Sequence, residues 1–281
     1  FKENERWKKG RYIMKKYIYI ISITIIAIFI LGVVNNVKKS DTVQTSSNIQ
    51  NNDISNKKIE WGIKRNKEHE QPDVGSKNRE ILEKYDGICF ANDEKKEVVI
   101  TFDEGYEAGY TGQILDTLKE NNVKATFFIT SHYLNTASDL VERMINEGHI
   151  VGNHTVNHKS MPEISDEEIE NEVMKLHKSM YEKFGYEMKY IRPPKGEFSE
   201  RTLAICQKLG YQNVMWSFAY VDWNENNQPN IEKSKKLILD YTHNGEIILL
   251  HGNSKTNTDI LDSIIKGIKE QGYEIKSLDE I

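Results

Sequence analysis

Apolar residues recur along the chain with two periods, and their alternation after about residue 86 indicates an α/β domain. Short apolar runs predict strands at residues 97–102, 126–129, 149–152, 190–192, 214–216, 247–250 and 273–275. Apolar positions spaced three and four apart predict helices at residues 112–120, 137–147, 166–184, 200–209, 231–241 and 258–270. Ser165 is the predicted N-cap of the longest helix. This alternation is typical of parallel strands joined by crossover helices, in an open sheet or a barrel.

A different pattern occupies the N-terminal part of the chain. Residues 17–34 are almost uninterruptedly apolar, and a helix of about 20 such residues spans a bilayer. Residues 1–16 are rich in lysine and arginine, so the positive-inside tendency places them in the cytoplasm. We therefore predict one N-terminal transmembrane helix, with the rest of the chain exported toward the cell wall. A cleaved secretory signal is the alternative, although no small-residue cleavage site follows the run.

Two segments separate this predicted anchor from the α/β domain. Residues 35–58 are rich in Asn, Ser, Thr, Asp and Lys and cannot bury enough apolar surface to offset ordering, which predicts a flexible linker. Residues 59–94 contain Trp61 and a short periodic stretch at residues 81–85, and we predict an extension that packs on the following domain. The predicted α/β domain spans residues 95–281.

Composition narrows the possible partners. The chain of 281 residues has 38 Lys and Arg against 43 Asp and Glu, for a formal net charge of -5. Its lysines alternate with glutamates as on a solvated surface, so no cationic face is predicted and nucleic acid is not an expected partner. Cys89 and Cys206 are the only cysteines, which excludes a disulfide framework. We expect a monomer.

Three separated polar clusters follow predicted strands. Thr-Phe-Asp-Glu-Gly occupies residues 101–105, His154 and His158 are four residues apart, and His251 ends an apolar run. Taken singly, each also fits a structural interpretation, as an acidic turn, a pair of surface histidines or a packed histidine. Loops that leave the carboxyl ends of parallel strands converge, however, so the clusters are expected to meet. Together they supply the parts of a metal-assisted hydrolase with its own acid and base.

In order and spacing these segments resemble the polysaccharide deacetylase superfamily, carbohydrate esterase family 4. The five motifs of that family correspond to Thr-Phe-Asp-Glu-Gly at 101–105, His-Thr-Val-Asn-His at 154–158, Arg-Pro-Pro at 192–194, Asp-Trp at 222–223 and Leu-Leu-His at 249–251. From about residue 59 to the end, the chain is similar to peptidoglycan N-acetylmuramic acid deacetylases that form muramic δ-lactam in spore cortex. The resemblance implies a distorted (β/α) barrel and a peptidoglycan glycan strand as substrate.

The resemblance also implies a role for each acid and base. Asp103 would be the general base that takes a proton from water, and Arg192 would orient it. His251 would be the general acid that protonates the departing amine. Its imidazolium needs a carboxylate neighbour, which the family places at Asp222.

A metal site is implied as well. His154 and His158 would ligate a divalent cation, with Glu104 as the third ligand at a position where most of the superfamily has aspartate. Zinc is the first choice for a histidine-rich site with an open position, and cobalt or manganese are the alternatives. Because the glutamate stem is one methylene longer than that of aspartate, position 104 is where this sequence departs from the pattern.

Three residues are assigned to substrate binding by the same resemblance. The backbone N–H of Lys195 would help to hold the oxyanion, and Trp223 and Leu249 would form walls of the groove. The expected function is a metal-dependent N-deacetylase that acts on N-acetylmuramic acid of peptidoglycan. Two alternatives remain: deacetylation of N-acetylglucosamine in peptidoglycan or chitin-like oligomers, and an inactive carbohydrate-binding wall protein.

Overall fold

The computed structural model describes residues 54–92 and 94–281, so the predicted cytoplasmic segment, the apolar run and most of the predicted linker lie outside the described residues. In the described part of the chain, we find no helix that is both long and apolar enough to cross a membrane. Residues Ile54–Ile281 form one compact unit.

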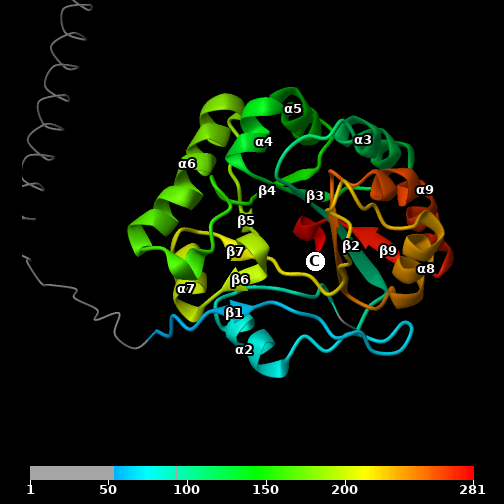
Figure 1. The fold of residues 1–281 in the computed structure, drawn as a ribbon, viewed down its shortest axis with the longest axis horizontal. Coiled ribbons are helices and arrows are strands. Elements are labelled where there is room, and N and C mark those ends of the chain that lie inside the picture. Colours follow the sequence, from blue (N-terminus) through cyan, green and yellow to red (C-terminus); the bar gives the residue numbers. More distant parts are fainter. Residues whose placement is uncertain (1–53, 93) are drawn as a thin grey trace, which may run out of the picture. The chain divides into compact units, whose positions relative to one another are not determined.

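Parallel strands form the centre of this unit (Figure 1). They are β2 (Glu97–Glu104), β3 (Thr126–Ile129), β4 (Ile150–Asn153), β5 (Tyr190–Ile191), β7 (Gln212–Asn213), β8 (Glu246–His251) and β9 (Glu274–Lys276). The order in the sheet is β7-β5-β4-β3-β2-β8, and β9 pairs with the start of β2 on the edge opposite β8. Every pairing in this sheet is parallel. The curved sheet forms a parallel half-barrel, which confirms the α/β class predicted from the sequence.

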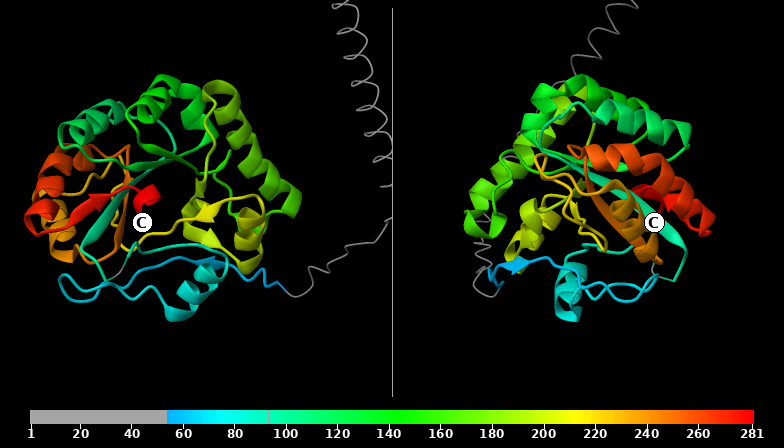
Figure 2. Two further views of the ribbon diagram at one scale, coloured as in Figure 1. Left: turned by 180° about the vertical axis from the view of Figure 1, so that it is seen from behind. Right: turned by 45° about the vertical axis from the view of Figure 1, so that its right-hand side comes forward.

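Helices cover the outer face of the half-barrel (Figure 2). They are α3 (Thr111–Glu120), α4 (Ser131–Thr136), α5 (Ser138–Asn146), α6 (Asp166–Phe184), α7 (Glu200–Lys208), α8 (Ile231–Tyr241) and α9 (Lys255–Glu270), with short 3-10 turns at Met161–Glu163, Pro194–Gly196 and Leu278–Glu280.

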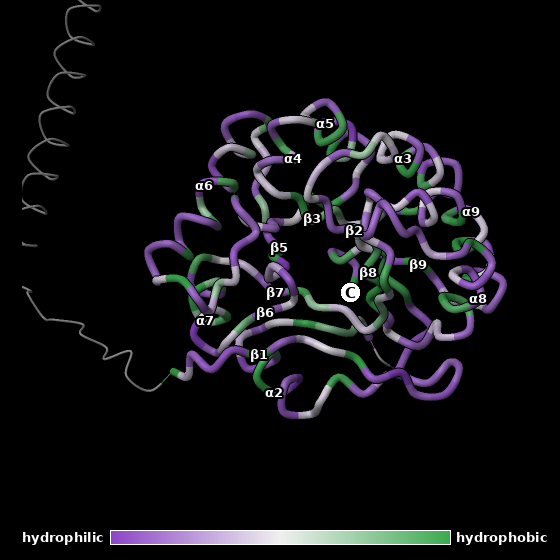
Figure 3. Tube along the Cα trace, in the orientation of Figure 1, coloured by the Kyte–Doolittle hydropathy of each residue, from purple (hydrophilic) through white to green (hydrophobic). Residues whose placement is uncertain are grey.

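Strand β2 shows why the strands appear in the sequence as continuous apolar runs: both of its faces are buried. Val98 and Ile100 belong to the main core beneath the helices, whereas Val99 belongs to a second core on the other face. Figure 3 shows the resulting concentration of apolar residues along the central strands.

The predicted helices agree well with the observed ones where capping signals are strong. α6 has the predicted bounds and begins with a capping box, in which Ser165 and Glu168 each accept a hydrogen bond from the other's backbone N–H. The helix predicted at residues 137–147 is α5. A separate helix that the pattern did not predict, α4, precedes it. The side chain of Thr130 caps α4 by accepting the N–H of Tyr133.

The strand predicted at residues 214–216 is wrong in position, because the observed strand ends just before it. β7 is Gln212–Asn213, and Val214 forms only an isolated bridge with Ile88. The N–H of Met215 donates to the carbonyl of Ile88 at 2.8 Å. The N–H of Val214 still donates to the carbonyl of Ile191 in β5 at 2.8 Å, so this apolar run lies between the sheet and a remote N-terminal segment.

That N-terminal segment packs against the half-barrel. β1 (Ile59–Glu60) pairs antiparallel with β6 (Glu197–Phe198), and α2 (Ser76–Lys84) follows it. Contacts begin before residue 59, inside the segment predicted as a linker. The side chain of Asn56 donates to the carbonyl of Pro162 at 3.0 Å and accepts from Ser199 at 2.9 Å. Polar composition alone predicts a flexible chain there, whereas these side-chain hydrogen bonds fix it.

Trp61 is the main anchor of this segment. Its backbone N–H donates to the carbonyl of Gly196 and its indole N–H to the carbonyl of Trp216, both at 2.9 Å. The ring is 7% exposed and packs beside Phe198, 6.2 Å between ring centroids. The segment thereby supports the turn at Pro194–Gly196, which borders the cavity described below.

Replacing Trp61 with Ala should lower the free energy of unfolding by about 3–5 kcal/mol, because it leaves a large void in a buried cluster. Trp61→Phe keeps most of the packing and loses the indole hydrogen bond, so it should cost only about 1–2 kcal/mol. Urea unfolding followed by circular dichroism measures both values. Equal losses for the two variants would contradict this packing role.

Candidate active site

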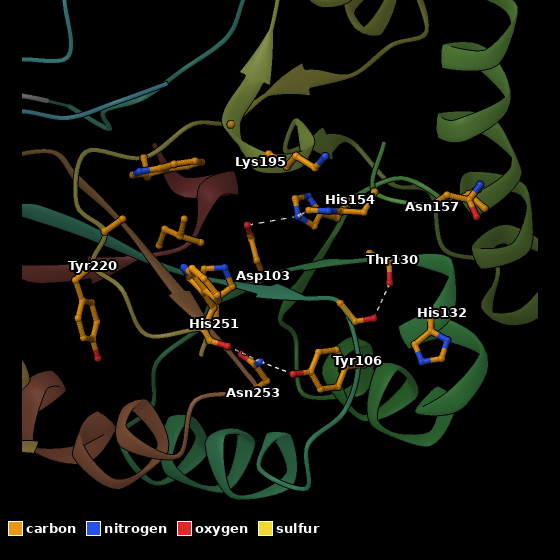
Figure 4. A pocket seen from close by; sticks show the side chains of 18 residues that line it. Asp103, Tyr106, Thr130, His132, His154, Asn157, Lys195, Tyr220, His251 and Asn253 are labelled. Carbon is orange, nitrogen blue, oxygen red and sulfur yellow. Dashed lines mark hydrogen bonds and ion pairs between the residues drawn. The ribbon is translucent and has the colours of Figure 1, made fainter. Parts of the chain in front are cut away.

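A cavity of about 890 Å³ lies at the carboxyl ends of the strands. Asp103 comes from β2 and His251 from the last position of β8, while His154 and His158 lie in the loop after β4. Figure 4 shows Asp103, His154 and His251 around the same space. The structure thus brings together residues that are far apart in the sequence. The other sequence-predicted residues on the cavity wall are Lys195, Trp223 and Leu249.

Asp103 is held by a buried ion pair. The Nη1 atom of Arg192 lies 2.8 Å from the Asp103 carboxylate and also donates to the Thr101 hydroxyl at 2.8 Å. Burial alone would raise the pKa of Asp103. The charge of Arg192, together with that of His251, outweighs that effect and holds the pKa below its usual value. Asp103 is therefore an ionised carboxylate at neutral pH, as a general base must be.

Arg192 itself is fully buried below the cavity. Its guanidinium lies over the ring of Phe128, 4.2 Å from the centroid, and 5.7 Å from that of Trp216. The Nε atom donates to the carbonyl of Val214 at 3.1 Å. Removal of one partner of such a buried pair leaves an uncompensated charge, which costs about 3–5 kcal/mol. The fold and the ionisation of Asp103 therefore depend on the same guanidinium.

His154 and His158 direct their Nε2 atoms at one another, 3.1 Å apart. The Nδ1 of His154 lies 2.9 Å from the carbonyl oxygen of Arg192. Because a carbonyl only accepts, Nδ1 carries the proton and Nε2 keeps its lone pair. Burial lowers the pKa of His154, and it lowers that of His158 to about 4. Both imidazoles are therefore neutral at pH 7, the state in which histidine binds metals.

The loop that carries these histidines has a special backbone. Thr155 and His158 have φ values of 69° and 54°, in the left-handed region that few non-glycine residues adopt. Glu172 of α6 holds the loop: its carboxylate accepts the backbone N–H of Asn157 at 2.7 Å and the side-chain amide at 2.6 Å. We did not identify Glu172 from the sequence. Glu172 could have been noticed because its carboxylate comes three residues after Ile169, on the apolar face of the helix.

His251 is paired with Asp222. Its Nδ1 lies 2.7 Å from one carboxylate oxygen, and its backbone N–H donates to the other at 2.9 Å. Burial alone would lower the pKa of His251, but the carboxylate outweighs burial and raises it. Asn257 of α9 also donates to Asp222, at 2.6 Å. Asn257 could not be predicted from the sequence, since its contact with Asp222 depends on how α9 packs.

Glu104 lies outside the cavity, so its assignment as the third metal ligand is not supported by this geometry. Successive strand residues point to opposite faces, and Asp103 takes the cavity side of β2. The Glu104 side chain is 1% exposed, contacts the Thr111 hydroxyl at 3.5 Å and leaves Oε2 without a hydrogen-bond partner. A Cβ atom at Gly252 would lie 1.9 Å from its Oε1. Burial, ahead of repulsion from Glu107, raises the pKa of Glu104 well above its usual value.

A metal fits the histidine pair. In tetrahedral zinc sites with Zn–N bonds of about 2.0–2.1 Å, two ligand nitrogens lie roughly 3.3 Å apart, close to the 3.1 Å seen between His154 and His158. No set of three His, Cys, Asp or Glu side chains within residues 54–92 and 94–281 is close enough to form a complete site. The two imidazoles are therefore the side chains that would hold the cation.

Comparison with known proteins agrees with this arrangement. The sequence profile of the polysaccharide deacetylase family matches residues 91–214. The chain is 40% identical over 229 residues to the peptidoglycan-N-acetylmuramic acid deacetylase PdaA of Bacillus subtilis, covering 81% of this chain and 87% of PdaA. A peptidoglycan-N-acetylglucosamine deacetylase of Bacillus cereus is 34% identical, over 70% of this chain and 72% of the relative.

The solved structure of B. subtilis PdaA, a family 4 carbohydrate esterase, has a TM-score of 0.78 against this structure, with 81% of this chain and 97% of PdaA covered. The fold and site define an α/β amide hydrolase with a half-barrel core. The chain belongs to the polysaccharide deacetylase family, which confirms the resemblance of its five motifs.

The position of Glu104 predicts how metal binding responds to mutation. Glu104→Gln should leave the zinc dissociation constant within about twofold, because the side chain points away from the imidazoles. His158→Ala should weaken zinc binding by at least about 100-fold, since it removes one of two ligands. Competition titration with a zinc indicator measures both. A large loss of affinity in Glu104→Gln would show that the carboxylate ligates the metal after all.

Proposed function

We propose that the protein is a metal-dependent N-deacetylase of N-acetylmuramic acid residues in peptidoglycan, on the route to muramic δ-lactam in spore cortex. The observation that carries the chemistry is the grouping of ionised Asp103, the neutral pair His154 and His158, and the Asp222-bound His251 around one cavity. Similarity to PdaA over 81% of the chain supports the choice of sugar.

The residues of the chain divide the chemistry between them. Ionised Asp103 accepts a proton from the water that attacks the acetyl carbonyl, and Arg192 keeps it ionised before each turnover. Protonated His251 then donates to the amine nitrogen as the C–N bond breaks, which leaves acetate and a free amino sugar. The backbone N–H of Lys195 helps to stabilise the oxyanion. Trp223 presents a 55% exposed indole on the cavity wall, suited to the face of a sugar ring.

A divalent cation at His154 and His158, with zinc preferred over cobalt or manganese, would polarise the acetyl carbonyl and acidify water. Zinc is preferred because the donor set consists of neutral imidazoles at a spacing that suits tetrahedral coordination.

We further propose that residues 17–34 anchor the protein in the cell membrane, with residues 1–16 in the cytoplasm and the catalytic domain on the cell-wall side. The support is the apolar run and the basic residues before it. Alkaline extraction of membranes should leave the protein in the pellet, and protease added to intact protoplasts should degrade the catalytic domain. Release by alkali would favour a cleaved or peripheral form.

N-acetylglucosamine is the competing substrate, favoured by the 34% identity to the B. cereus enzyme. Mass spectrometry of the digested product shows which sugar has lost its acetyl group. An inactive carbohydrate-binding protein is disfavoured, because such a protein has no need for the ion-paired Asp103, the metal-binding imidazoles and the Asp222–His251 pair together.

The direct test incubates the full chain, in mild detergent, with peptide-free glycan strands and zinc, cobalt or manganese. We expect release of acetate matched by free amine or lactam on muramic acid. No acetate with any of the three metals would contradict the proposal.

Replacing Asp222 with Asn should move the alkaline limb of the pH–kcat profile to lower pH. His251 acts in its protonated form, and Asp222 raises its pKa, so the active form persists to higher pH in the wild type. Without the carboxylate the pKa falls and the proton is lost earlier, and kcat should drop by at least about 100-fold. Asp259→Asn, at an exposed ion pair of α9, is the matched control. An unshifted limb in Asp222→Asn would exclude His251 as the acid.

A further inference from the structure

The cavity wall carries one permanent positive charge that the chemistry above does not use. Among the described residues that line the cavity, Lys195 is the only lysine or arginine. It is exposed, and within the part of the chain that the structure describes its ammonium forms no ion pair. Glu197, two residues away, is 3.5 Å from Lys58, and the charge of Lys195 helps to lower the pKa of Glu197 without an ion-pair contact. The Lys195 ammonium is therefore available to a ligand.

The backbone of Lys195 is fixed although its side chain is not. Lys195 has φ 61° and Gly196 has φ 68°, so the turn uses two left-handed residues in succession. A Cβ atom at Gly196 would lie 2.8 Å from the ring of Trp216 and 3.2 Å from Trp61. The turn is thus closely packed on its far side, and the position from which the Lys195 side chain starts is well defined.

The ammonium lies close enough to the reacting centre to act on a bound sugar. Figure 4 shows Lys195 on the same side of the cavity as His154, opposite Tyr106 and Asn253. Lys195, His154 and His158 line the same cavity, so a sugar whose acetamide lies at the imidazoles is within reach of this ammonium.

The substrate proposed above offers a matching charge. N-acetylmuramic acid differs from N-acetylglucosamine by an ether-linked lactyl group on the ring carbon next to the one that bears the acetamide. An acetamide at Asp103 and His154 thus places the lactyl carboxylate within a few bonds of the reacting carbonyl. The carboxylate is charged only while no peptide is attached to it through an amide.

We propose that Lys195 is a specificity residue whose ammonium binds the lactyl carboxylate of N-acetylmuramic acid. It selects sugars with a free carboxylate over N-acetylglucosamine and over muramic acid whose lactyl group is amide-linked. The proposal rests on the N-deacetylase function. Three ammonium donors suit a carboxylate acceptor, and a pair within a partly enclosed cavity is less screened than one on an open surface.

The test removes the charge of Lys195 and the charge of the lactyl carboxylate, separately and together. Wild type, Lys195→Gln and Lys195→Arg are assayed as the full chain with zinc on peptide-free glycan strands, and on the same strands with lactyl carboxyls converted to methylamides. We expect wild type to prefer the free acid in kcat/KM by about tenfold, which corresponds to about 1.4 kcal/mol. Lys195→Gln should lose this preference, because its fall in kcat/KM on the free acid should be about tenfold larger than any fall on the methylamide. Lys195→Arg and the control Lys208→Gln, an exposed lysine of α7, should keep it.

Two results would overturn the proposal: an unchanged preference in Lys195→Gln, or an equal loss on both substrates, which would indicate a structural or oxyanion role. Binding of both strands, measured by titration calorimetry with a chelator present, separates this proposal from the proposed function. If acetate is never released, the deacetylase function fails. The carboxylate preference in binding, and its loss in Lys195→Gln, would still decide the role of Lys195.

Discussion

The buried ion pair between Arg192 and Asp103 sets the charge of the active site and ties it to the fold. The guanidinium is fully enclosed and bridges from the segment after β5 to the end of β2. The carbonyl of the same arginine fixes the tautomer of His154, so one residue aligns both the proposed base and a proposed metal ligand. Since a buried charge without its partner costs several kcal/mol, the half-barrel must close around this pair before the site exists.

The pKa values of the three histidines at this site are shifted in different directions because their surroundings differ. His154 and His158 are largely buried, and although the Asp103 carboxylate lies 3.5 Å from the Nε2 of His154, burial outweighs its charge, lowers both pKa values and keeps both rings neutral. His251 is also buried, yet its contact with Asp222 reverses the effect and favours the charged form. The proposed metal ligands and the proposed general acid are thus the same residue type in two environments. The exposed charge of Lys195 is separate from this set, which leaves it free to recognise a substrate group.

Local signals and a few spaced motifs predicted the fold class and the residues that line the cavity, while long-range contacts decided the rest. α6 was predictable because Ser165 and Glu168 are neighbours in sequence. The partner of Val214 was not, because Ile88 lies far away in the chain. Glu104 was assigned as a metal ligand by its place in a motif, and in this structure its carboxylate is buried beside Thr111 and Gly252 and does not line the cavity. Glu172 supports the histidine loop through packing that no local pattern reveals.

The ionisation state of Asp103 tests this arrangement most directly. The infrared difference spectrum between wild type and Asp103→Asn at pH 7 isolates the bands of this one carboxyl group. With the guanidinium of Arg192 2.8 Å away, we predict the antisymmetric and symmetric stretches of an ionised carboxylate. The carbonyl stretch of a protonated acid at that pH would contradict the assignment of Asp103 as the base and of the ion pair as its cause.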